Sequence, residues 1–313
     1  METKVAAVSM RGVTKTFGAV IANEDVDLDI YKGEILALLG ENGSGKTTLM
    51  NMLSGIYFPD QGQIMINGQN VVIASPKDAL NLGIGMVHQH FKLVDVLTAA
   101  ENIILGLPGK EILDMQEVVQ KITELVERYG FELNPNQKIY EMSVSQKQTV
   151  EIIKVLYRGA GILILDEPIN GLDPEGIREI RECLLKLNRE EGKTILISSH
   201  ILGELSKIAT QYGIIKDGRL IRQMTKEDLE EQCRDYLLVE VEHTERAAAV
   251  LAENIPDVSF EVFAQGRIHI YDYLDSGQVT TLLVQNGVTV YSCGLHQIDL
   301  EQYFLELMDG GAK

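Results

Sequence analysis

The residues best suited to chemistry form a glycine-rich segment in the first part of the chain. Gly40-Glu41-Asn42-Gly43-Ser44-Gly45-Lys46-Thr47 fits the spacing G-x-x-x-x-G-K-[ST]. Glycines let backbone N–H groups wrap a phosphate, and the start of the following helix favours negative charge. Lys46 then reaches the β- and γ-phosphates, while the Thr47 hydroxyl ligates Mg²⁺. The pattern therefore predicts a nucleoside triphosphate site that extends to Thr48.

Two adjacent carboxylates follow an apolar run further along the chain. The run Ile162-Leu163-Ile164-Leu165 leads directly into Asp166 and Glu167, and open α/β sheets bind ligands at the carboxyl ends of their strands. Because side chains alternate along a strand, we expect the two carboxylates to point in different directions. We assign Asp166 to the Mg²⁺ shell and Glu167 to the attacking water. A solvated turn is the alternative, but the phosphate loop favours the catalytic interpretation.

Two more polar residues follow expected strands at the same edge. His200 comes after the strand 194–198, where an imidazole is able to donate a hydrogen bond to a γ-phosphate oxygen. Gln89 follows the short strand 84–87 and is a candidate contact for Mg²⁺ or water. Taken alone, a lone histidine is usually structural, and Gln89 is better explained as a polar loop residue with its hydrogen bonds satisfied.

Strands that alternate with helices must position these groups. Apolar periodicity switches between 2 and 3.6 over roughly the first 220 residues, which predicts an α/β core. The unbroken apolar run 35–39 is typical of a strand buried on both faces, and a helix is expected over 48–54. Between about 91 and 159 the strand signals fade, so a helical insertion is predicted there.

The last part of the chain predicts a separate module. Thr225 and the acidic residues after it are typical of a helix start. From about residue 236 the order is strand, helix, two strands, helix, strand, as in small ferredoxin-like α+β domains. We therefore divide the chain into 1–224 and 225–313. Three cysteines occur in no C-x-x-C pair and are expected to be small buried residues: Cys183, Cys233 and Cys293.

Composition excludes several classes of protein. The 313 residues include 46 acidic and 28 basic side chains, a formal net charge of -18. Such a field repels nucleic acid, so no nucleic-acid partner is expected. No apolar run of about 18 residues occurs, and the first four residues do not resemble a secretory signal. A cytoplasmic chain is predicted.

Over about residues 5 to 224 the ordered motifs resemble those of the ATP-binding subunits of ATP-binding-cassette (ABC) transporters. The resemblance implies a P-loop NTPase core of ABC type with a helical subdomain, and an ATPase that uses ATP and Mg²⁺. It implies that Phe17 stacks on adenine and that Gln89 lies in the loop that couples to the membrane subunit. The implied catalytic residues are Lys46, Gln89, Glu167 as the base and His200 as the switch histidine. The implied metal ligands are Thr47, Gln89 and Asp166.

The family signature corresponds to Met142-Ser143-Val144-Ser145-Gln146. The resemblance implies a head-to-tail homodimer in which Ser143, Ser145 and Gln146 of one subunit contact the ATP held by the other. Ser145 stands where the family usually has glycine. Its Cβ is expected to crowd the nucleotide or to require a positive φ, and therefore to slow hydrolysis without abolishing it.

The resemblance also implies a separate transmembrane permease subunit that holds the chain at the inner face of the membrane. Segments such as 85–94 and 101–106 resemble ATPases of sugar and nucleoside importers. Segments such as 170–174 and 212–215 resemble ATPases of multidrug, bacitracin and lantibiotic exporters. Length and the C-terminal extension favour an exporter of peptide or antibiotic substrates. A nucleoside or sugar importer, or an ATP-dependent regulatory module with weak turnover, remain the alternatives.

Overall fold

A six-stranded sheet carries the predicted chemistry along one edge. The computed structural model describes residues 5–107, 114–199, 201–255, 258–271, 275–297 and 300–308. The strand order is β10-β9-β3-β8-β7-β6, and all neighbours except β9 and β10 run parallel. The strands are β3 (Ile35–Leu39), β6 (Ile84–Val87), β7 (Ile162–Asp166), β8 (Thr194–Ser198), β9 (Gln211–Lys216) and β10 (Arg219–Thr225). Every residue of β3, β7 and β8 is buried, as expected for parallel strands covered on both faces.

A second, antiparallel sheet packs beside the first. Its order is β2-β1-β4-β5, formed by β1 (Ala6–Phe17), β2 (Val20–Tyr31), β4 (Gln61–Ile66) and β5 (Gln69–Val71). Apolar side chains from β1, β2 and β4 share one core with β3 and α1 (Lys46–Leu53). In the sequence, only the alternation of Val26, Leu28 and Ile30 with acidic residues predicts a strand of this sheet. Several register shifts between β1 and β2 break the period of two that would have shown the rest.

The predicted helical insertion contains α3 (Ala99–Ile104), a short 3-10 turn (Ile139–Glu141), α4 (Met115–Tyr129) and α5 (Val144–Tyr157). Helix α4 stops at Gly130, whose φ of 75° suits glycine. Its last turn contacts the end of α6 (Pro174–Glu191), since the Tyr129 hydroxyl donates to Glu191 Oε1 at 2.6 Å. Arg128 pairs with the same carboxylate at 2.7 Å. The remaining helices of this part are α2 (Pro76–Asn81) and α7 (Leu202–Leu205).

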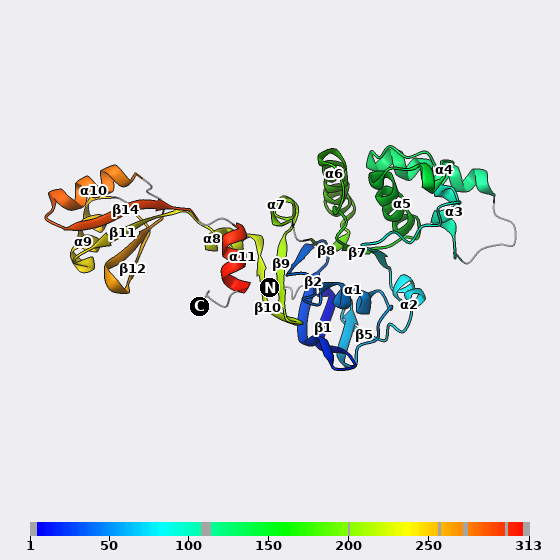
Figure 1. Cartoon of the computed structure of the whole chain (residues 1–313), viewed down its shortest axis with the longest axis horizontal. Helices are drawn as coiled ribbons and strands as arrows, with labels where there is room; N and C mark the ends of the chain where they lie inside the picture. Colours follow the sequence, from blue (N-terminus) through cyan, green and yellow to red (C-terminus); the bar gives the residue numbers. More distant parts are fainter. Residues whose placement is uncertain are drawn as a thin grey trace. The chain divides into compact units, whose positions relative to one another are not determined.

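The chain divides into two compact units, Met1–Lys226 and Glu227–Lys313. The second unit has the predicted α+β order (Figure 1). Its elements are β11 (Tyr236–Val241), α9 (Thr244–Asn254), β12 (Phe260–Phe263), a 3-10 turn (Ala264–Gly266), β13 (Arg267–Ile270), α10 (Ser276–Gln285) and β14 (Val290–His296). The sheet order is β12-β13-β11-β14, with every pair antiparallel. This arrangement confirms the ferredoxin-like prediction.

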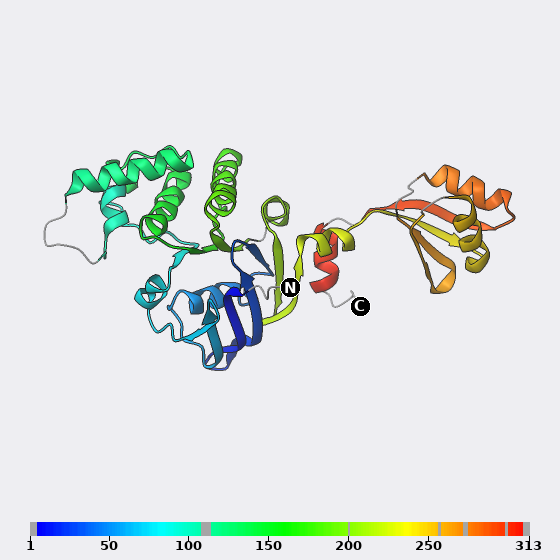
Figure 2. The same ribbon diagram turned by 180° about the vertical axis from the view of Figure 1, so that it is seen from behind.

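Two short helices flank that sheet in the sequence, α8 (Lys226–Gln232) and α11 (Leu300–Met308), as Figure 2 shows from behind. Two expectations need correction. The apolar pattern predicts the last strand over 288–292, whereas β14 spans 290–296 because its pairing with β11 continues to His296. Of the three cysteines only Cys183 is buried, while Cys233 and Cys293 are half-buried. Among the described helices, none is long and apolar enough to cross a membrane.

Candidate functional site

The phosphate loop joins β3 to α1 and depends on two glycines for different reasons. Gly43 and Gly45 have φ values of 84° and 103°, a region that residues with a Cβ avoid. A Cβ on Gly45 would lie 2.4 Å from the carbonyl oxygen of Ala22 and 2.6 Å from Nδ2 of Asn23. Nothing lies within 4 Å of a Cβ on Gly43. Gly45 is therefore required because β2 packs closely against it, whereas Gly43 is required only for its left-handed backbone conformation.

Lys46 begins α1 and is 6% exposed. Its ammonium donates to the carbonyl oxygens of Gly40 at 2.7 Å and Glu41 at 2.9 Å. Burial lowers the pKa of Lys46, and the nearby Glu167 and Asp166 carboxylates oppose that effect. The lysine is thus held over the loop, close to both predicted carboxylates.

Ser198 links the two carboxylates to the neighbouring strand. Its hydroxyl donates to Asp166 Oδ1 at 2.7 Å, and the backbone N–H of Glu167 donates to the same hydroxyl at 3.1 Å. Sequence reasoning did not identify Ser198, although it ends β8 at the edge where functional residues were sought. The contact fixes the relative position of the two acidic residues.

The predicted reason for the direction of Glu167 is wrong. Strand β7 ends at Asp166, and Glu167 has a left-handed backbone with φ of 51°. This conformation, anchored by an N–H donated to the Ser198 carbonyl at 3.2 Å, orients Glu167 instead of strand alternation. Such strain in a glutamate is uncommon and occurs often at functional sites.

The residues around the loop fit the phosphate groups and magnesium that were predicted. The Ser44 hydroxyl is buried without a hydrogen-bond partner, so it is available to a phosphate oxygen. Thr47 is exposed in the first turn of α1, whereas Asp166 is 1% exposed. Hydroxyl and carboxylate oxygens are the ligands that Mg²⁺ prefers. Thr48, half-buried beside them, completes the predicted loop set.

Phe17 presents an exposed aromatic ring at the end of β1. The ring is 43% exposed and meets Tyr57 edge-on at 5.0 Å between centroids. Lys15 Nζ lies 5.5 Å from the Phe17 centroid. An exposed ring supported from one side is suited to stacking on a base. Tyr57 was missed because it follows α1 with no pattern that marks it.

Other predicted residues lie apart from the loop cluster or outside the described chain. Gln89 is exposed after β6 and lines a cavity of about 320 Å³ with Phe91 and Lys147. His200 lies outside the described residues. The signature residues Ser143, Ser145 and Gln146 belong to the start of α5, in the helical insertion.

Ser143 and Gln146 close the first turn of α5 with a capping box. The Ser143 hydroxyl accepts from the Gln146 N–H at 3.2 Å, and the Ser143 N–H donates to Gln146 Oε1 at 3.0 Å. This reciprocal pair satisfies two backbone donors that the helix start would otherwise leave free. It also leaves the Gln146 amide nitrogen as the donor of that side chain.

Of the two effects expected from Ser145, crowding of the nucleotide or a positive φ, the structure excludes the positive φ. Ser145 lies in the first turn of α5 and is absent from the described non-glycine residues with left-handed backbone. Its side chain instead faces the start of α6, since a Cβ on Gly176 would lie 3.0 Å from Ser145 Oγ and 3.2 Å from its Cβ. Ser145 and Gly176 are therefore matched in size within one chain.

We expect a double-mutant cycle to reveal this match. Gly176→Ala alone should leave the free energy of unfolding unchanged or lower it, because the contact with Ser145 offsets the better helix propensity of alanine. In a Ser145→Gly background the same change should be more favourable by about 0.5–1 kcal/mol, with Asp173 Oδ1 still 3.0 Å from the new Cβ. Urea unfolding of the four proteins measures the coupling, expected near 1 kcal/mol. Purely additive effects would contradict the contact.

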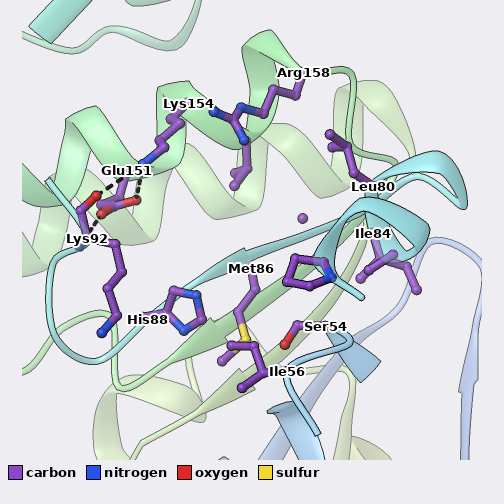
Figure 3. Close-up of a pocket in the computed structure, with 14 residues that line it drawn as sticks. Ser54, Ile56, Leu80, Ile84, Met86, His88, Lys92, Glu151, Lys154 and Arg158 are labelled. Atoms are coloured by element: carbon purple, nitrogen blue, oxygen red, sulfur yellow. Dashed lines mark hydrogen bonds and ion pairs between the residues drawn. The ribbon is translucent and has the colours of Figure 1, made fainter. Parts of the chain in front are cut away.

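A separate cavity of about 190 Å³ lies against the helical insertion (Figure 3). Apolar residues such as Ile84 and Met86 line one side, while Glu151, Lys154 and Arg158 project from α5. Their spacing of three and four residues puts them on one face of the helix. That spacing was the signal in the sequence by which the cavity wall could have been found.

Glu151 is the centre of the polar wall. Its side chain is 3% exposed, accepts from the Lys92 N–H at 2.7 Å and lies 3.7 Å from Lys154 Nζ. Burial lowers the pKa of Lys154, Arg158 and His88. The cavity thus combines an apolar side with the half-buried basic side chains of Lys154 and Arg158 around a buried carboxylate.

The sequence is similar to a known protein family and to ATP-binding proteins of transporters. The ABC transporter family matches residues 23–170. The chain is 50% identical over 216 residues to a nucleoside import ATP-binding protein of Lactococcus lactis, covering 68% of this chain and 42% of that protein. It is 32% identical over 305 residues to the bacitracin transport ATP-binding protein of Bacillus licheniformis, covering 96% of each. The chain spans less than half the length of the import proteins that head these relatives.

The fold also matches solved structures. A dimeric ATP-binding cassette bound to ADP and phosphate, in a post-hydrolysis state, superimposes with a TM-score of 0.62 at 28% identity. The match covers 70% of this chain and 98% of that one. A Clostridium perfringens cassette that is part of an ABC transporter complex matches with a TM-score of 0.63 at 26% identity, over 80% of this chain and 96% of that chain.

Proposed function

Since the chain belongs to the family of ABC transporter ATP-binding proteins, we propose that it hydrolyses ATP as the motor subunit of a membrane transporter. The observation that carries the proposal is the phosphate loop after β3, with Lys46 close to the two buried carboxylates at the end of β7. Lys46 and the loop N–H groups bind the phosphates. Phe17 stacks on the base.

Glu167 acts as the general base, since its buried carboxylate is able to accept the proton of the attacking water. Thr47 and Asp166 hold Mg²⁺, with Gln89 as a further ligand. The bound ion neutralises charge on the phosphates. His200 donates to the γ-phosphate. Ser198 fixes Asp166 and the backbone of Glu167, so it is a positioning residue.

The working form is a head-to-tail homodimer, in which the Ser143 hydroxyl and the Gln146 amide of one subunit contact the nucleotide of the other. The dimeric cassette among the similar structures supports this arrangement. The capping box favours it as well, because it fixes both side chains at the start of α5 before the partner arrives. Ser145 acts in this arrangement by packing against Gly176 at the start of α6, and its backbone is not strained.

A permease subunit docks at the segment around Gln89 and at the cavity beneath Glu151, which holds the chain at the inner face of the membrane. The apolar side of that cavity supports a protein segment as the occupant. Export of a peptide or antibiotic is favoured because the bacitracin transport protein matches along 96% of both chains. Nucleoside import is the second candidate, favoured by the 50% identity of the Lactococcus protein. The membrane subunit that co-purifies with the chain discriminates between them.

Phosphate release at increasing protein concentration tests the motor function. With Mg²⁺ and ATP in excess, we expect the rate to rise more than linearly with concentration until the dimer is saturated, because each site needs residues from two subunits. Sedimentation with ATP should show the dimer over the same range. A rate strictly proportional to concentration, with the chain monomeric in ATP, would refute the shared site.

A further inference from the structure

Strand β14 forms an edge of the sheet in the second unit and carries no charged residue. The surrounding unit is strongly acidic, with 17 acidic and four basic residues over 227–313. In contrast, the whole stretch 276–297, which contains α10 and β14, has no Asp, Glu, Lys or Arg. A neutral strip on a unit of high charge is a specific feature of this surface.

The edge lacks the usual protection against pairing. Exposed edge strands are commonly shortened, charged or interrupted by proline, because their free N–H and C=O groups recruit another strand. Strand β14 has seven residues and no proline, Asp, Glu, Lys or Arg, its one titratable base being His296 at the end, and among the described strands it pairs only with β11. Tyr291 and Leu295 on it are 67% and 50% exposed. The opposite edge, β12, has only four residues and includes Glu261.

We propose that β14 pairs antiparallel with β14 of a second copy of this chain, which joins the two sheets into one. A two-fold axis makes such an edge self-complementary, since each strand offers the same groups to the other. The second units of the two copies are both acidic and repel one another over the rest of their surfaces. The neutral strip is therefore the place where the two copies approach at least electrostatic cost. A basic partner would instead be drawn to the acidic surface and would gain no attraction from the strip.

The pairing requires no nucleotide, so it is separable from the ATP-dependent dimer. We expect the full chain without ATP to sediment as a dimer at about 100 µM. Tyr291→Lys combined with Leu295→Lys should weaken this dimer by at least about tenfold, because two like charges then face each other across the edge. Val262→Lys is the matched control, since Val262 is 49% exposed on β12, and it should leave the dimer unchanged.

Hydrogen exchange of the unaltered chain gives a second measurement that needs no variant to fold. Backbone amides of 290–296 should become more protected as protein concentration rises, while those of 260–263 should not. A monomer without nucleotide at that concentration, or an edge variant that dimerises as strongly as the unaltered chain, would overturn the proposal. So would exchange in β14 that is independent of concentration. The outcome does not depend on whether the chain hydrolyses ATP.

Discussion

Glu167→Gln should lower phosphate release by roughly 100-fold to 1,000-fold while leaving ATP binding intact. Glutamine has nearly the same shape and backbone preference as glutamate, so the left-handed turn and its contact with Ser198 should persist. What is lost is the group that accepts the proton of the attacking water. Single-turnover phosphate release and nucleotide titration separate the two effects.

Glu182→Gln is the matched control, because Glu182 is an exposed carboxylate on α6, outside the phosphate loop and the carboxylate pair. Its side chain has no role in the proposed reaction, and the rate should stay within about twofold of that of the unaltered protein. If Glu167→Gln retained most of the hydrolysis rate, the assignment of the general base would be wrong. ATP-dependent dimerisation of the glutamine variant should be stronger, since bound ATP persists.

Gly45→Ala should cost far more stability than Gly43→Ala, although both glycines belong to the phosphate loop. A Cβ on Gly43 meets nothing, so only the left-handed backbone opposes it, which costs about 1 kcal/mol. A Cβ on Gly45 would overlap the backbone of β2 at 2.4 Å from Ala22, so a loss of about 3 kcal/mol or more is expected. Urea unfolding without nucleotide compares the two variants directly. Equal losses in the free energy of unfolding would mean that β2 shifts at little cost to make room for the Cβ at position 45.

The sequence predicted the main sheet well because its strands are unbroken apolar runs. Strands 35–39, 84–87 and 194–198 have the same bounds in the structure. Complete burial of 35–39 and 194–198 leaves a continuous signal, and in 84–87 only Met86 is half-buried. The proximity of Lys46 to Asp166 and Glu167 followed from one rule, that parallel strands end at a common edge. Local chemistry and topology were enough for that part of the candidate site.

Other features depended on contacts between distant segments that no local pattern records. Ser198 was missed as a link between the carboxylates because the registry of β7 against β8 decides which side chains meet. The direction of Glu167 required a left-handed backbone that neighbouring strands hold in place. Likewise, the packing of Ser145 beside Gly176 joins two helices that are distant in the sequence. Tertiary packing, rather than sequence preference, fixes each of these.

Helix α6 connects with the helical insertion at both of its ends, through Gly176 beside Ser145 and through Glu191 bound by Tyr129. Its 18 residues span about 27 Å, so the two contacts hold the insertion at points far apart along one rigid helix. The insertion cannot rotate about one contact without breaking the other. Any rotation of α5 against the sheet must therefore carry α6 with it or break the contact between Tyr129 and Glu191, and α6 begins at Pro174, soon after Glu167, the proposed general base.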